Sequence, residues 1–96
     1  MYVVTLTHTP EQCMARKEFA PEYRNWLAGM DDQAQKLGIR IHEACVCPNE
    51  HTFWFMLEAG DFKDITAFLS GFWLTHHSGR VSPVVTLSEA SDILIK

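Results

Sequence analysis

The sequence predicts a single small α+β domain built on an antiparallel sheet. Segments rich in β-branched and aromatic residues alternate with segments whose apolar residues recur at helical spacing. The chain has 96 residues, which is enough for one domain covering residues 1–96. With 47% hydrophobic and 21% charged residues, it has an ordinary globular composition and no tract polar enough to suggest disorder.

The first half of the chain contains a strand, a short helical turn and a long helix. Residues 2–7 are rich in β-branched side chains and should form the first strand. Thr9 can cap the helical turn that follows, with Pro10 at its first position. The long helix should begin near Pro21 and end before Gly38. Its apolar stripe consists of Tyr23, Trp26, Leu27, Met30, Ala34 and Leu37.

The middle of the chain predicts a β-hairpin. Residues 39–47 and 51–59 should form its two strands, joined by a three-residue turn at 48–50. In such a hairpin Cys47 lies opposite His51.

The last third predicts a second helix, a strand and a short terminal helix. Asp61 is a natural N-cap for the helix, which continues to the histidine pair before Ser78 and is only weakened near its end by Gly71. Its buried face consists of Ile65, Phe68, Leu69 and Phe72. Residues 81–87 should form the fourth strand, and Pro83 places that strand at an edge of the sheet. A terminal helix can start at residues 88–90.

The resulting order, β-α-β-β-α-β, is that of the ferredoxin-like fold, with both helices on one face of the sheet. The third strand is apolar on both sides, because Phe53, Phe55 and Leu57 alternate with Trp54 and Met56. The second face should therefore be covered by the sheet of a second copy, which predicts a homodimer or a higher homo-oligomer.

Charge and hydropathy exclude several classes of function. The formal charge is −4 and the basic residues form no patch, which argues against nucleic-acid binding. No apolar run approaches the roughly 20 residues that span a membrane, and the first residues lack the pattern of a signal peptide. The three cysteines cannot all pair within the chain, which predicts reduced thiols and a cytoplasmic location.

The predicted topology gathers most of the histidines and all of the cysteines at one end of the sheet. His42 is expected lower, on the other face of the second strand. The residues expected at that end are His8, Cys13, Cys45, Cys47, His51, His76 and His77. Imidazole and thiolate are common ligands of zinc, copper and iron, so these seven are candidate ligands of a transition metal.

A polar mouth above the apolar helix-facing side of the sheet is also a candidate small-molecule pocket. Its predicted residues are His8, Cys13, His51, His76 and Arg80. Structural roles compete with these assignments. Cys45 and Cys47 could be plain buried side chains, and His76 and His77 could form a solvated helix end.

Three motifs resemble a group of small uncharacterised proteins in the dimeric α+β-barrel superfamily. They are Thr-His-Thr-Pro-Glu-Gln-Cys at 7–13, Pro-Asn-Glu-His-Thr-Phe at 48–53 and Pro-Val-Val-Thr-Leu at 83–87. The resemblance covers nearly the whole chain and implies a sheet-to-sheet dimer that closes into an α+β barrel. Members of the superfamily include cofactor-free monooxygenases, isomerases, haem-handling enzymes and ligand-sensing domains.

Three functions therefore stay open, and no catalytic residue is assigned. The first is binding of a metal or metallocofactor by the His/Cys group. The second is a cofactor-free enzyme for a small organic molecule, with His8, His51 and His76 transferring protons. The third is a non-catalytic binding or interaction module that needs none of the histidines.

Overall fold

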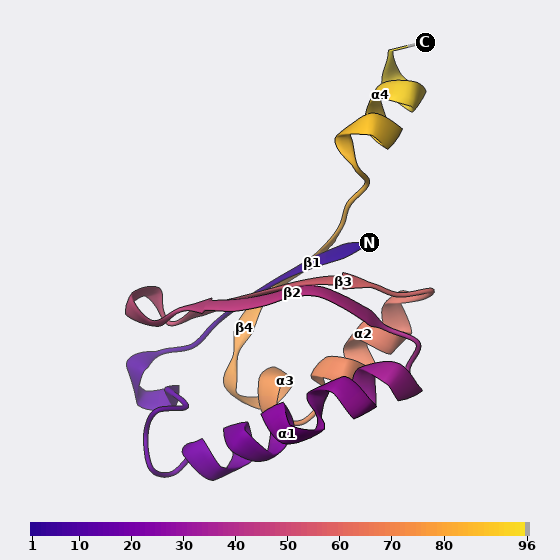
Figure 1. Cartoon of the computed structure of the whole chain (residues 1–96). Coiled ribbons are helices and arrows are strands. Elements are labelled where there is room, and N and C mark those ends of the chain that lie inside the picture. Colours follow the sequence, from indigo (N-terminus) through magenta and orange to yellow (C-terminus); the bar gives the residue numbers. More distant parts are fainter. Residues whose placement is uncertain (96) are drawn as a thin grey trace.

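Over residues 1–95, which the computed structural model describes, the chain forms a four-stranded antiparallel sheet (Figure 1). The strands lie in the order β2-β3-β1-β4, and every neighbouring pair is antiparallel. This confirms the predicted α+β class, and the order is consistent with a ferredoxin-like fold.

The helices and strands follow one another much as the sequence predicts. Their bounds are β1 (Tyr2–Thr7), η1 (Pro10–Gln12), α1 (Ala20–Lys36), β2 (Arg40–Cys47), η2 (Pro48–Glu50), β3 (Thr52–Glu58), α2 (Phe62–Leu69), α3 (Phe72–His76), β4 (Ser78–Pro83) and α4 (Leu87–Leu94). No helix within residues 1–95 combines the length and the apolar character that crossing a membrane requires.

Helices α1, α2 and α3 all lie on one face of the sheet, and the core fills the space between the two layers (Figure 1). Trp73 of α3 is at its centre and is only 1% exposed. Its ring packs against the rings of Trp26, Phe53, Phe55 and Phe72, with centroids 4.7–5.3 Å apart. Large aromatic side chains dominate the energetics of such a core. The sequence-based list of buried residues missed Trp73.

The second helix of the prediction is two helices. Gly71 has a φ of 78°, a left-handed conformation that other residues rarely adopt, and it separates α2 from α3. Gly71 therefore ends the first of these helices, whereas the sequence analysis expected it only to weaken a single continuous helix. The break lets α3 begin in a new direction, with Trp73 in the core and His77 at its C-terminal cap.

The predicted three-residue hairpin turn is wrong. Cys47 pairs with Thr52, because η2 and His51 together form a four-residue connection in which His51 has a φ of 50°. Since side chains alternate across a strand, a slip of one residue moves Cys45 and Cys47 to the opposite face. Both share that face with Thr52 and Trp54, away from the helices.

The last strand starts three residues earlier than predicted and ends at Pro83. It lies at an edge of the sheet, as Pro83 predicted. After β4 the chain leaves the sheet, and α4 extends away from the rest of the molecule (Figure 1). Thr86 and Glu89 form a capping box at the start of α4, which fixes its first turn.

Two glycine-to-alanine substitutions should have opposite effects on stability. A Cβ on Gly79 of β4 would overlap the backbone carbonyl oxygen of Thr5 in β1, so Gly79→Ala should lower the free energy of unfolding by about 1–3 kcal/mol. Gly29 lies exposed within α1 with no atom near its added Cβ, so Gly29→Ala should raise it by about 0.5–1 kcal/mol. Urea unfolding followed by circular dichroism measures both. Equal stability of the two variants would contradict the tight β1–β4 pairing.

Candidate metal centre

Three histidines lie side by side at one end of the neighbouring strands β3, β1 and β4. In the register, Thr7 of β1 lies opposite Thr52 of β3 and Ser78 of β4. The residues one step beyond these three are His8, His51 and His77. Strand pairing alone therefore brings together histidines that are 43 and 69 residues apart in the chain.

The three imidazoles form a chain with His8 in the middle. Nε2 of His8 lies 3.2 Å from Nδ1 of His51, and Nδ1 of His8 lies 3.0 Å from Nε2 of His77. Both ring pairs meet edge to face, with centroids 5.0 and 4.8 Å apart. The backbone N–H of His8 also donates to the carbonyl oxygen of His51 at 3.2 Å, which holds the first pair in place.

Cys13 completes a group of possible metal ligands. It caps η1, where its backbone N–H donates to the carbonyl oxygen of Pro10. His8, Cys13 and His51 each offer one ligand atom, and these three atoms lie within 4.8 Å of one another. No other group of three His, Cys, Asp or Glu within residues 1–95 comes this close.

The spacing suits a tetrahedral metal ion. Two nitrogen ligands at roughly 2.0–2.1 Å from tetrahedral zinc are about 3.3 Å apart, and a thiolate at roughly 2.3 Å lies about 3.6 Å from each nitrogen. His8 Nε2 and His51 Nδ1 share a hydrogen bond at 3.2 Å, close to the first value, and a bound ion would displace the shared proton. The Cys13 Sγ atom lies no more than 4.8 Å from the ligand nitrogens of His8 and His51.

Two of the three imidazoles, those of His77 and His8, have pKa values below the usual value for histidine. The pKa of His77 is lowered to about 4, first by burial and then by the nearby His8 and His76. Burial also lowers the pKa of His8, assisted by His51. A metal binds only the unprotonated nitrogen of a histidine, so the lowered pKa of His8 favours the form of this residue that could bind one.

His77 has one nitrogen that stays unused. Its Nδ1 is buried and has no hydrogen-bond partner within residues 1–95. In one tautomer of the three imidazoles, His77 Nε2–H donates to Nδ1 of His8. The Nδ1 of His77 then carries only a lone pair, which has no partner. In the other, His8 Nδ1–H donates to His77 Nε2, and the N–H on His77 Nδ1 has the backbone carbonyl of Trp73 nearby, which raises the pKa of His77.

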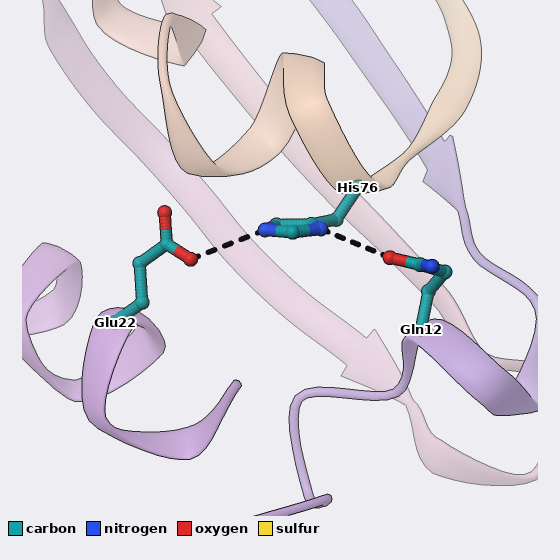
Figure 2. Close-up of polar contacts among 3 residues, drawn as sticks. All are labelled: Gln12, Glu22 and His76. Carbon is teal, nitrogen blue, oxygen red and sulfur yellow. Dashed lines mark hydrogen bonds and ion pairs between the residues drawn. The ribbon is translucent and has the colours of Figure 1, made fainter. Parts of the chain in front are cut away.

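His76 is held apart from the chain by two other side chains. Its Nδ1 lies 3.0 Å from Oε1 of Gln12, and its Nε2 lies 3.1 Å from Oε1 of Glu22 (Figure 2). These contacts tie the end of α3 to η1 and to the first turn of α1. Because both ring nitrogens face oxygen atoms of the protein, His76 links three segments and is not a free metal ligand.

The group of seven predicted ligands is therefore divided. Cys45 and Cys47 lie on the face of the sheet away from the helices, because Cys47 pairs with Thr52 and not with His51. Arg80 of β4, which was predicted to line the pocket, also lies on that other face. It pairs with Thr5 of β1 and is exposed. His42, predicted to lie apart, does so, and its Nε2 is 2.9 Å from Oε1 of Glu58.

Two cavities flank His8. One, of about 150 Å³, is lined by His8, Cys13 and His51 together with Met14, Tyr23 and Phe53. The other, of about 250 Å³, is lined by His8, His76 and His77 together with Gln12 and Thr75. Four of the five residues predicted to line a pocket thus do so, divided between two cavities.

Sequence reasoning missed Gln12 and Glu22, which hold His76. Neither forms a recognisable motif with His76, because Gln12 lies 64 positions and Glu22 lies 54 positions before it in the chain. A polar residue at a helix start has many ordinary roles, so no signal in the sequence singles out these two.

Comparison with protein-family models, with curated proteins and with solved structures gave no match to this chain. The resemblance to the dimeric α+β-barrel superfamily therefore stays a prediction.

The low pKa of His77 predicts a loss of stability in acid. The unfolded chain binds a proton on this residue near pH 6.5, whereas the folded protein does so only near pH 4. The unfolded state therefore binds more protons in this window, so stability should fall as the pH falls from about 6.5 to about 4. Urea unfolding of EDTA-treated protein at several pH values measures the slope. His77→Gln should make it shallower, and parallel curves for variant and wild type would contradict the assignment.

Proposed function

We propose that this protein binds a transition-metal ion, zinc foremost, through His8, Cys13 and His51. One observation carries the proposal: three ligand atoms from separate segments lie within 4.8 Å of one another, with two nitrogens at the spacing of a tetrahedral site. Two imidazoles and a thiolate suit zinc, copper and iron. Magnesium and calcium prefer oxygen ligands and fit this set poorly.

Three protein ligands leave one tetrahedral position open. Structural zinc sites usually use four protein ligands, whereas catalytic sites keep a position for water or substrate. Here the open position would face the cavity of about 150 Å³ that the same three residues line. The proposed centre would therefore bind an exchangeable small molecule.

His77 would act as an outer partner that orients His8. If Nε2 of His8 binds the ion, the proton of its ring must sit on Nδ1, from where it can donate to Nε2 of His77 at 3.0 Å. Such outer contacts fix the tautomer and ring orientation of a metal-binding histidine. Because His77 is neutral near pH 7, it can accept this bond.

Metal uptake tests the proposal. Untagged protein should carry zinc or take up one equivalent of zinc or cobalt, as measured by native mass spectrometry with elemental analysis. His8→Ala and Cys13→Ser should weaken binding at least about tenfold, the loss that follows even when an outer-shell partner is changed. His42→Ala and Cys47→Ser are the matched controls, since both residues lie outside the group. Wild-type protein that takes up none of zinc, cobalt, copper or iron would overturn the proposal.

A cofactor-free acid–base enzyme is the second candidate function. The specific observation in its favour is the hydrogen-bonded chain His51–His8–His77, which borders a cavity on each side of His8 and could move a proton between them. His76, the third histidine predicted for this role, is already bonded to Gln12 and Glu22. A non-catalytic module, the remaining alternative, would tolerate replacement of all these histidines.

We further propose that the working unit is a homodimer formed through the open face of the sheet. Within residues 1–95 no helix packs on this face (Figure 1), yet it presents Trp54 and the 38% exposed Met56. The projecting α4 also carries apolar side chains in water, with Leu87 88% and Leu94 79% exposed. Apolar surface of this kind on a soluble chain usually marks a contact site, and a second copy offers a matching surface.

The dimer predicts a mass of about 22 kDa, twice the 11.0 kDa of the chain, in size-exclusion chromatography with light scattering. Trp54→Asp should shift the protein toward the monomer, because a carboxylate would be buried without a partner in the interface. Leu74→Asp is the matched control, since Leu74 is 51% exposed on α3, away from the open face. A monomeric wild type would overturn the proposed dimer.

The predicted cytoplasmic location stays a proposal. All three cysteines are free, and Cys13 is needed as a thiolate for the metal centre. A reducing compartment keeps such thiols available.

A further inference from the structure

We propose that the protein binds a small molecule whose uncharged aromatic ring fills an apolar cavity between α1 and β2 and whose donor group reaches the metal. This inference rests on the proposed metal centre for its donor group. The ring-binding cavity stands on separate observations.

The cavity adjoins the metal centre. It has a volume of about 170 Å³, and it shares the residues Tyr23, Val46 and Phe53 with the cavity that His8, Cys13 and His51 line. A molecule could therefore occupy both spaces at once, with one end beside the metal ligands and the other between helix and sheet.

The lining of this cavity selects an apolar, aromatic occupant. None of the residues that line it is charged, so an ionic group would lose its hydration without gaining a partner. Four of them are aromatic, namely Tyr23, Phe53, Phe55 and Trp73, and can pack face or edge against a ring.

The size limits the occupant to about one ring. An apolar cavity of about 150 Å³ in another protein takes up benzene, and the volume here is about 170 Å³. The adjoining space of about 150 Å³ beside the metal ligands has room for a short donor group.

The cavity is open to solvent along the edge of the sheet. Leu27 of α1 and Val46 of β2 border it and are 42% and 43% exposed, although both are apolar. Strand β2 is an edge strand, and its residues Ala44, Cys45 and Val46 are exposed. A ligand could enter here without unfolding either element.

Tyr23 lines both spaces, and its hydroxyl could contact the polar head of a ligand. Its side chain lines both cavities, and its hydroxyl makes no hydrogen bond within residues 1–95. Burial raises the pKa of Tyr23, so the hydroxyl stays protonated near pH 7 and can donate to the head of a ligand.

The test compares two hydroxamates on cobalt-loaded protein. Both carry the same metal-binding group, but benzohydroxamate has a ring where acetohydroxamate has a methyl group. Both should change the visible absorption of the cobalt ion. The affinity for benzohydroxamate should be at least about tenfold higher than that for acetohydroxamate, because burying the ring adds enough binding free energy for such a difference. Equal affinities would overturn the proposal.

Filling the cavity provides the matched control. Ala44→Trp should weaken benzohydroxamate about tenfold and leave acetohydroxamate unchanged, since Ala44 lines the ring cavity and not the metal-side one. Ala28→Trp, on the exposed side of α1, should change neither. If Ala44→Trp fails to fold, Leu27→Trp fills the same cavity from the helix. Loss of both hydroxamates in a folded filled variant would overturn the division into a ring and a donor subsite.

A metal-free arm separates this inference from the proposed metal function. Fluorobenzene should bind the EDTA-treated wild-type protein and should not bind the Ala44→Trp variant. Fluorine NMR measures this binding. Fluorobenzene binding without any cobalt uptake would overturn the metal centre and uphold the ring cavity. Cobalt uptake without fluorobenzene binding and without preference for benzohydroxamate would uphold the metal centre and overturn the ring cavity.

Discussion

The pairing of β1 with a strand on each side is the constraint on which both the core and the candidate site depend. The register that puts Thr7 opposite Thr52 and Ser78 also sets Val4 and Leu6 against the helices. A shift of either neighbour by one residue would turn its apolar side chains away from the core. Because the core enforces this register, it also enforces the placement of His8, His51 and His77 at the next step along each strand.

The site is built where apolar packing ends and polar groups begin. Phe53 contacts Trp73 in the core and also the rings of His8 and His77, with centroids 4.7, 6.0 and 5.7 Å apart. The histidines are thus half-buried against the aromatic core, and this burial lowers the pKa of His8 and His77. Imidazoles held against this aromatic core would offer nitrogen ligands at the proposed metal centre.

The two sides of the sheet have different roles. The side that faces the helices carries the core, the imidazole chain and the adjoining cavities. The open side carries Trp54, Met56, Cys45 and Arg80, and it is where a second copy would pack. A dimer of this kind would leave the metal centre of each subunit accessible, because the centre lies on the helix side. Binding and assembly would therefore use separate surfaces of one small domain.

The sequence by itself determined the class of fold, because β-branched runs, helical spacing and capping residues act locally, and Pro83 alone placed β4 at an edge. It also brought His8, Cys13 and His51 to one end of the sheet, since strand order follows from the sequence of elements. Only the tertiary structure decided the rest. The left-handed His51 lengthened the hairpin and sent Cys45 and Cys47 to the other face, and Gly71 broke the second helix. Both outcomes depend on single backbone angles that packing selects, and a pattern of apolar residues does not contain them.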